Sequence, residues 1–257
     1  MTFKDNAFNS ERKDLGDENY LHIINIEEID AKLASLIDDS IVKICQGNSD
    51  TDLCIIKRRL IAFLTPKRGT TTEMGAIAEF FGHLYLNTIG FKQEFLFLNL
   101  EEESIKKGFD GYYSLSNEEW IYESKSGSIA TENISHRAKI KEAYDDLEKK
   151  ISGDIKNNPW QNAYLHANLI DVGSASNIRK NLKRLSEEFT RGEHHNISDF
   201  NVMPGSTLFL EGAWNCINSV DLEHKIKNLI KNFKFKKINI LCVNKTSLNL
   251  FWDYLES

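Results

Sequence analysis

Three prolines in 257 residues leave few fixed breaks in the chain, and no stretch is rich in both glycine and serine. This composition argues against a long flexible linker. No apolar run approaches the roughly 20 residues that a membrane-spanning helix needs. The opening segment Met1–Ser10 is polar and lacks the apolar centre of a signal peptide. We therefore expect a cytoplasmic protein that does not bind a membrane.

Two further motifs are absent. The four cysteines form no Cys-x-x-Cys pair, and Cys45, Cys54, Cys216 and Cys242 each lie in an apolar stretch. This pattern predicts buried free thiols in a reducing compartment rather than disulfides or metal ligands. The sequence also lacks the glycine-rich loop that cradles nucleotide phosphates, so we do not expect this chain to use ATP.

Negative charge is confined to one end of the chain. Residues 1–50 hold 11 acidic and 5 basic residues, whereas the remainder holds 27 of each, so the net charge of -6 arises wholly in the N-terminal fifth. Nucleic-acid binding depends on the local field rather than on the net charge. An acidic end is therefore compatible with a nucleic-acid enzyme.

Apolar periodicity predicts a mixed α/β fold. We expect strands over Leu21–Ile26 at a sheet edge, Phe91–Leu100, both arms of a hairpin that turns at Ser116-Asn117, Thr207–Glu211 and Ile238–Val243. We expect helices over Glu27–Ile44, Thr51–Leu64, Thr70–Thr88, Thr131–Ile151, Asn162–Ile170, Ser174–Thr190, Val220–Phe233 and Ser247–Leu255. Met1–Tyr20 reads as a loosely ordered lead-in.

We divide the chain at residue 65, with an acidic helical region over residues 1–65 and the main domain over residues 66–257. The N-terminal region is either a separate lobe or a cover over the core, and the sequence leaves both open. If the region is a lobe, we expect the segment from about Ile26 to Leu64 to dock a protein partner. An acidic surface repels phosphates and complements a basic protein face.

The richest chemistry lies in the hairpin, in Gly108-Phe109-Asp110-Gly111 and Ile121-Tyr122-Glu123-Ser124-Lys125. A turn at Ser116-Asn117 places Asp110 directly opposite Glu123, with Cβ atoms about 5 Å apart. Side chains alternate along a strand, so Glu123 and Lys125 share one face. Three charged groups therefore converge on one spot of an otherwise apolar sheet.

An Asp and a Glu-x-Lys on neighbouring strands suit metal-dependent phosphodiester hydrolysis. Carboxylates are preferred ligands of Mg²⁺, with Mn²⁺ as an alternative, and such a cation activates water for attack on phosphorus. We expect Asp110 and Glu123 to bind the metal, with the Ser124 carbonyl also in reach. Lys125 would hold the attacking water or offset the charge that builds on phosphorus.

A further carboxylate is expected from the helix before the hairpin, where Glu73 and Glu79 are both candidates. They lie about 240° apart around a helix, so they do not face the same site. Glu79 sits within the apolar face, where a carboxylate needs a partner such as a metal. Glu73 is better explained as a first-turn charge that stabilises the helix dipole. We favour Glu79 as a site residue.

The segment from Glu73 to Lys125 resembles the PD-(D/E)xK nuclease fold. More narrowly, Gly75–Glu79, Lys107–Gly111 and Glu123–Lys125 resemble the HamA family, the nuclease subunits of Hachiman anti-phage defence systems. This resemblance implies a restriction-endonuclease-like mixed central sheet flanked by helices. Phe109 stands where the superfamily has its proline, a departure that is common within it.

The resemblance also implies a metal-dependent DNase that is restrained by a helicase subunit, HamB, and released when aberrant DNA ends appear. It assigns the metal ligands to Asp110 and Glu123, the lysine to Lys125 and the helix carboxylate to Glu79. The implied partners are DNA and the helicase, with no small-molecule substrate. A non-catalytic scaffold that binds DNA or tethers a helicase is the alternative, and a site-specific restriction enzyme would need a base-reading module that we do not identify.

Other polar clusters carry two interpretations each. The basic stretches Lys225–Lys237 and Arg179–Arg184 are either DNA contacts or solvated helix faces. His136 and Arg137 either contact phosphates or lie on an exposed helix face. His194-His195 lacks partners at metal-ligand spacing and is read as a solvated loop.

Overall fold

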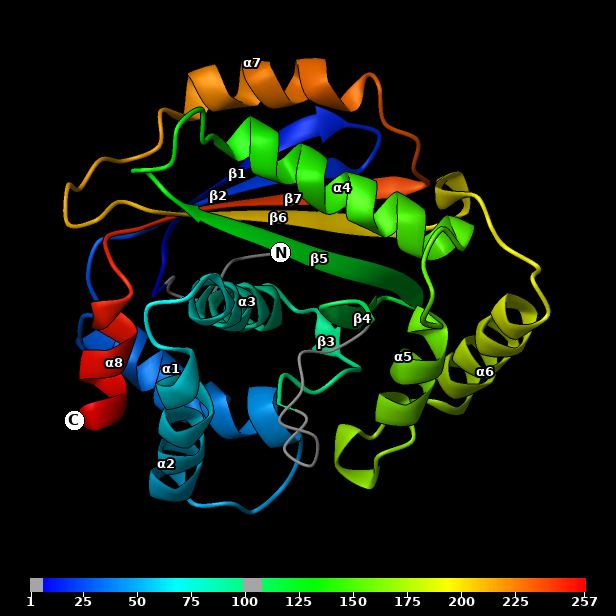
Figure 1. Ribbon diagram of the computed structural model, residues 1–257, viewed down its shortest axis with the longest axis horizontal. Helices are drawn as coiled ribbons and strands as arrows, with labels where there is room; N and C mark the ends of the chain where they lie inside the picture. Colours follow the sequence, from blue (N-terminus) through cyan, green and yellow to red (C-terminus); the bar gives the residue numbers. More distant parts are fainter. Residues whose placement is uncertain (1–6, 99–107) are drawn as a thin grey trace.

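A computed structural model describes residues 7–98 and 108–257 of the chain (Figure 1). Within these ranges a seven-stranded sheet has the order β1-β2-β7-β6-β5-β4-β3. Strands β2, β7, β6 and β5 run parallel, whereas β1, β4 and β3 pair antiparallel to their neighbours. The strands are β1 Asn9–Gly16, β2 Asn19–Ile26, β3 Lys92–Gln93, β4 Gly111–Leu115, β5 Glu118–Ser128, β6 Asn201–Phe209 and β7 Lys237–Lys245.

Helices cover both faces of this sheet, which confirms the predicted mixed sheet flanked by helices (Figure 1). One face packs against α1 Ala31–Gln46, α2 Leu53–Leu64, α3 Thr71–Thr88 and α8 Asn249–Glu256. The other core includes α4 His136–Ser152, α5 Pro159–Ala167, α6 Ser176–Thr190 and α7 Ser219–Ile230. Short 3-10 helices span Thr65–Lys67, Ile170–Val172 and Ile197–Asp199.

The predicted hairpin is confirmed in its turn and its register. Ser116 and Asn117 both have positive φ, 48° and 67°, as a tight two-residue hairpin turn requires. Gly111 pairs with Tyr122 and Leu115 pairs with Glu118. The same register, continued by one residue, places Asp110 opposite Glu123.

The N-terminal segment is not the loose lead-in that we predicted. Asn9–Gly16 forms β1, so β2 lies between β1 and β7 and is not an edge strand. The charged, mostly exposed side chains of β1 hid its strand character, and such residues are common on edge strands because they discourage pairing with another chain. Residues 1–6 lie outside the described ranges.

The sheet and its core run across residue 65. Strands β1 and β2 belong to the same sheet as β5 and β6, and α1 and α2 share one apolar cluster with α3 and α8. This arrangement supports the interpretation of the N-terminal region as a cover over the core. The boundary between two domains stays a prediction.

Two predicted strands have different limits in the structure. The strand predicted over Phe91–Leu100 is only Lys92–Gln93, because Phe95 and Phe97 are buried in an irregular segment; its last two residues lie outside the described ranges. Strand β6 begins at Asn201, six residues before our predicted start at Thr207. Pro204 and Gly205 disfavour strand assignment, yet all nine residues of β6 are buried between two parallel neighbours.

All four cysteines are free thiols, as predicted, but only two of them are buried. Cys45 and Cys242 lie in the core, whereas Cys54 and Cys216 are exposed. In the part of the chain that the structure describes, no helix is both long and apolar enough to cross a membrane.

Candidate active site

The hairpin β4–β5 brings the predicted hydrolytic residues together beside helix α4. Asp110 directly precedes β4, and its Oδ2 accepts a hydrogen bond of 2.7 Å from the backbone N–H of Ser124. Glu123 and Lys125 follow on the same face of β5, where Lys125 Nζ lies 3.1 Å from Glu123 Oε1. This contact shows that the alternation along β5 aims both side chains at one place.

The Glu123 carboxylate is buried and paired with two ammonium groups. Only 2% of its side chain is exposed, and its Oε2 lies 2.5 Å from Nζ of Lys150 on α4. Burying a charge is costly unless it is paired, so the two lysines make burial of Glu123 feasible. Lys150 was not predicted from the sequence as a site residue.

Asp146 is a second α4 residue that the sequence analysis missed. Its Oδ2 lies 2.5 Å from Nζ of Lys125. Burial acts to lower the pKa of Lys125, but Glu123, the Asp146 hydrogen bond and Asp110 outweigh it and raise the pKa. Lys125 is therefore a fixed cation. Asp146 and Lys150 are four residues apart and flank the buried stripe that contains Leu147, a spacing that marks one helix face.

Asp110 experiences an excess of negative charge. Burial, then the charges of Glu123 and Glu79, raise the pKa of its carboxyl group, while Lys150 and the Ser124 N–H act in the opposite direction. Carboxylates that raise one another's pKa are close in space. Asp110, Glu123 and Glu79 therefore form an electrostatic cluster whose repulsion a cation would relieve.

Glu79 reaches this cluster from α3, which packs on the opposite face of the sheet. Its Oε1 lies 3.1 Å from Nε2 of His83, and Nδ1 of His83 contacts the hydroxyl of Tyr113 on β4. Because 16% of the Glu79 side chain is exposed and His83 is fully buried, the histidine holds the carboxylate from the inside.

Glu73 lies elsewhere and has a structural role. It is 2% exposed, its Oε1 accepts a hydrogen bond of 2.6 Å from the indole of Trp252, and its Oε2 accepts one of 2.6 Å from the N–H of Gly69. Thr70 caps the helix by accepting the N–H of Glu73. Glu73 is therefore the acidic residue in the first turn of α3, as expected, and it is also a buried link between α3 and α8.

The donor chemistry of the cluster fits a hard divalent cation, because its donors are carboxylate oxygens. The side chains are not drawn together around a common centre, however: among the described residues, no group of three or more His, Cys, Asp or Glu side chains is close enough to hold a metal. Both oxygens of Glu123 instead face lysine ammonium groups. The arrangement neutralises Glu123 with the protein's own cations.

The remaining polar clusters are largely satisfied within the fold. His136 is buried, with hydrogen-bonding contacts to Ser206 Oγ at 2.9 Å and Asn244 Oδ1 at 3.0 Å, so neither predicted role applies to it. His194 is exposed, in line with the solvated-loop interpretation.

Within the basic stretches, many charges are paired with acidic neighbours. Lys225 pairs with Asp221 and Lys227 with Glu223 along α7. These pairs favour the interpretation of α7 as a solvated helix face over a DNA contact.

Comparison with models of known protein families yields a match over almost the whole chain. A family model described as HamA matches residues 1–252 of the 257. No curated protein matches the chain.

Proposed function

Because this chain belongs to the HamA family, and is therefore a protein associated with Hachiman defence, we propose that it is the metal-dependent DNA nuclease of that anti-phage system. The observation that carries the proposal is the convergence of Asp110, Glu123 and Lys125 on one face of the β4–β5 hairpin. A buried carboxylate, a carboxyl group whose pKa is raised and a fixed cation lie together here, and perturbed titratable groups gathered in one place support a catalytic site.

Each residue has a role in this proposal. Asp110 and Glu123 would hold Mg²⁺ or Mn²⁺, with the Ser124 carbonyl as a further oxygen donor and Glu79 contributing from α3. The cation supplies Lewis acidity and a more acidic water when bound. Lys125 provides a fixed positive charge beside the attacked phosphate, and Asp146 positions its ammonium group.

The proposed partners are DNA and a HamB-like helicase subunit that restrains cleavage in the cytoplasm. Restraint is needed because a nuclease without sequence specificity also cleaves the DNA of its host. The proposal places energy use in the helicase, since this chain lacks a glycine-rich phosphate loop.

The test is cleavage of plasmid DNA by the purified chain with Mg²⁺, Mn²⁺ or EDTA. We expect cleavage with either metal and none with EDTA. Asp110→Asn, Glu123→Gln and Lys125→Met should each lower the rate at least about 100-fold, the size typical of losing a central electrostatic group. Glu187→Gln, an exposed carboxylate on α6, is the matched control and should leave the rate unchanged. Equal rates in wild type and Glu123→Gln would refute the site.

A non-catalytic scaffold that binds DNA or tethers the helicase is the second candidate. The pairing of Glu123 with two lysines favours it, because these ion pairs engage both carboxylate oxygens that would otherwise bind a cation. A scaffold predicts DNA or helicase binding with no metal-dependent cleavage, and with no effect of Glu123→Gln beyond stability.

A further inference from the structure

Helices α5 and α6 form a hairpin whose charge is opposite to that of the whole chain. The two helices pack against each other at one side of the molecule, beyond β4 and β5 (Figure 1). Residues 155–186 hold one acidic and five basic residues, whereas the whole chain has a net charge of -6. We call this segment the basic hairpin. Its acidic residue is Asp171, and its basic residues are Lys156, Arg179, Lys180, Lys183 and Arg184.

The positive charge is least compensated in the first turns of α6. Lys180 is exposed, and no ion pair joins it to another residue of the described ranges. The guanidinium of Arg179 donates to the carbonyl of Ser174, which is a neutral partner. Lys183 Nζ lies 3.8 Å from Glu187, and both side chains are more than half exposed. Such an exposed pair is weak, so Lys183 remains available to an anion.

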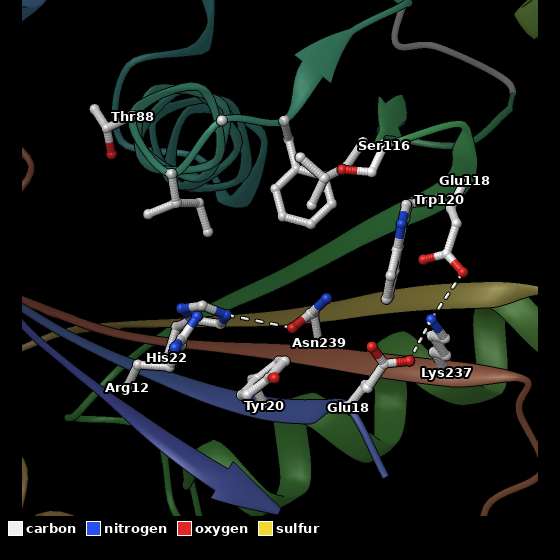
Figure 2. Close-up of a pocket in the computed structure, with 14 residues that line it drawn as sticks. Arg12, Glu18, Tyr20, His22, Thr88, Ser116, Glu118, Trp120, Lys237 and Asn239 are labelled. Carbon is white, nitrogen blue, oxygen red and sulfur yellow. Dashed lines mark hydrogen bonds and ion pairs between the residues drawn. The ribbon is translucent and has the colours of Figure 1, made fainter. Parts of the chain in front are cut away.

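Lysines elsewhere on the surface have closer acidic neighbours. Nζ of Lys237 lies 2.7 Å from Glu18 and 2.8 Å from Glu118, at the rim of a cavity of 410 Å³ (Figure 2). The α7 lysines described above are paired in the same way. The positive charge of the basic hairpin is therefore a local feature, and it favours a negatively charged partner.

The tip of the basic hairpin is apolar and exposed. Of the six large hydrophobic side chains that are exposed in the described part of the chain, three lie within residues 165–170. Leu165 is 56% exposed, Leu169 is 46% exposed and Ile170 is 91% exposed. Single exposed apolar residues are common, but a group of them marks an interaction site. The partner should therefore combine negative charge with apolar surface.

The basic hairpin is fixed beside the candidate active site. Trp160 of α5 is buried and packs edge-to-face against Phe109, with ring centroids 4.9 Å apart. Phe109 directly precedes Asp110. On α6, Asn181 Nδ2 lies 3.1 Å from each carboxylate oxygen of Glu119 on β5. A polymer that is bound at Asp110 therefore lies close to the base of the basic hairpin.

We propose that the basic hairpin binds single-stranded DNA. Lys180 and Lys183 contact phosphates, and Leu169 and Ile170 pack against unpaired bases. Duplex DNA stacks its bases inside the helix, so an apolar tip gains contact there only after unstacking. An acidic protein would also be attracted by the lysines, but the position beside Asp110 favours the substrate. The choice of DNA rests on the proposed nuclease function, whereas the choice of an anionic partner with apolar surface does not.

The first test measures the phosphate contacts by fluorescence anisotropy. A short labelled single strand is titrated with the full-length protein in EDTA, at salt concentrations from about 50 to about 200 mM. Lys180→Gln/Lys183→Gln should weaken binding at least about fivefold at low salt. It should also make the slope of log K against log salt less steep by about 1.4, which is about 0.7 for each lost contact. Lys225→Gln/Lys227→Gln on α7 is the matched control and should change neither quantity.

The second test measures the base contacts. Ile170→Ser should weaken binding of the single strand at least about threefold, leave the salt slope unchanged and have no effect on a duplex of the same length. Val220→Ser is the matched control, because Val220 is 73% exposed on α7 and should leave binding unchanged. The altered side chains are exposed, and melting curves check that each variant is folded.

The outcomes separate this proposal from the proposed nuclease function. Binding through the basic hairpin without cleavage in Mg²⁺ or Mn²⁺ would refute the nuclease and support the hairpin as a DNA contact. The proposal is overturned if the chain does not bind the single strand, or if the α6 and α7 double variants weaken binding equally. Wild-type DNA binding by Lys180→Gln/Lys183→Gln would also overturn it and would leave an acidic protein as the partner. An equal loss for single strand and duplex in Ile170→Ser would refute the contact with unpaired bases.

Discussion

At the scale of single residues, the candidate site is a balance of buried charges. Glu123 is almost fully enclosed, and among the described residues the ammonium groups of Lys125 and Lys150 pair with its carboxylate. Removing one partner of a buried pair costs much more than the pair contributes, because the other charge stays buried. Substitutions here therefore change stability as well as chemistry, and the two must be measured separately.

Lys150 is the residue whose effect on metal binding is most easily separated from its effect on stability. Its Nζ lies 2.5 Å from Glu123 Oε2. If Glu123 binds a metal, Lys150 competes with the cation for this oxygen. In Lys150→Met we expect Mn²⁺ to bind about tenfold more tightly, a factor that corresponds to about 1.4 kcal/mol. The metal-free protein should melt at a lower temperature, and Mn²⁺ should restore it. Isothermal titration calorimetry and melting curves measure both effects.

Lys149→Met is the control for this prediction, since Lys149 is exposed and adjacent on α4. It should leave Mn²⁺ affinity unchanged. Unchanged or weaker Mn²⁺ binding in Lys150→Met would show that Lys150 does not compete with the metal. Slower cleavage with unchanged metal affinity would instead indicate a contact with DNA phosphate.

His136 makes stability depend on pH. Burial lowers its pKa to about 4 from the ordinary 6.5, although the hydrogen bond to Asn244 acts in the opposite direction. The unfolded chain therefore binds more protons than the folded protein between these two values. The stabilisation is fully present above pH 6.5 and is lost as the pH falls toward about 4.

The neighbours of His136 that contact its ring, Ser206 and Asn244, are neutral, so the change in charge belongs to the histidine. The unfolding free energy of the wild-type protein should fall between about pH 7 and about pH 4.5. In His136→Gln this fall should be smaller by about 2 kcal/mol. Urea unfolding at the two pH values measures it. His194→Gln, at an exposed histidine, should leave the loss unchanged. An identical loss in wild type and His136→Gln would contradict the assignment.

At the scale of elements, α3 carries two carboxylates that have different roles. Glu73 links its first turn to Trp252 on α8, and Glu79 acts on Asp110 and contacts His83. The two positions face different neighbours because they lie about 240° apart around the helix. One helix therefore joins the C-terminal end of the chain to the candidate site.

The two glutamates should give opposite results when changed. Glu73→Gln should lower the unfolding free energy by about 1–3 kcal/mol, because it weakens a buried, charge-assisted hydrogen-bond pair, and leave cleavage unchanged. Glu79→Gln should lower Mn²⁺ affinity and cleavage with little loss of stability, since its side chain is partly exposed. Paired melting and cleavage assays measure these effects. The reverse pattern would move the site to Glu73.

The elements also show how far sequence reasoning reached. Turn chemistry at Ser116-Asn117 and strand alternation were sufficient for the hairpin, its register and the proximity of Glu123 to Lys125, because these are local properties. Asp146 and Lys150 were missed because their role depends on how α4 docks against β5, which is a long-range property. The strand that we predicted to start at Thr207 was too short for the same reason. Burial of β6 between two parallel strands overrides the local effect of Pro204.

At the scale of the whole molecule, the acidic N-terminal fifth is built into the fold and still presents charge to solvent. Strands β1 and β2 complete the sheet, and the apolar side of α1 lies in the core with α3. Deleting Met1–Ser49 would therefore remove two strands and a helix and would not isolate a binding surface. Substitutions at exposed acidic residues preserve the fold and are the sharper test of docking.

We predict that this acidic surface docks the helicase subunit. Glu27, Glu28 and Asp39 are exposed, and an acidic face complements a basic protein while repelling DNA. The triple reversal of these residues to lysine should lower co-purification with the helicase at least about tenfold at low salt, where charge pairs are least screened. Cleavage by the isolated chain should stay at the wild-type rate.

The matched control is the triple substitution of the exposed Glu187, Glu193 and Asp221 by lysine, which should leave co-purification with the helicase intact. Normal helicase binding by the first variant would rule out docking through this surface. Equal losses in both variants would show that total charge, rather than this face, controls association.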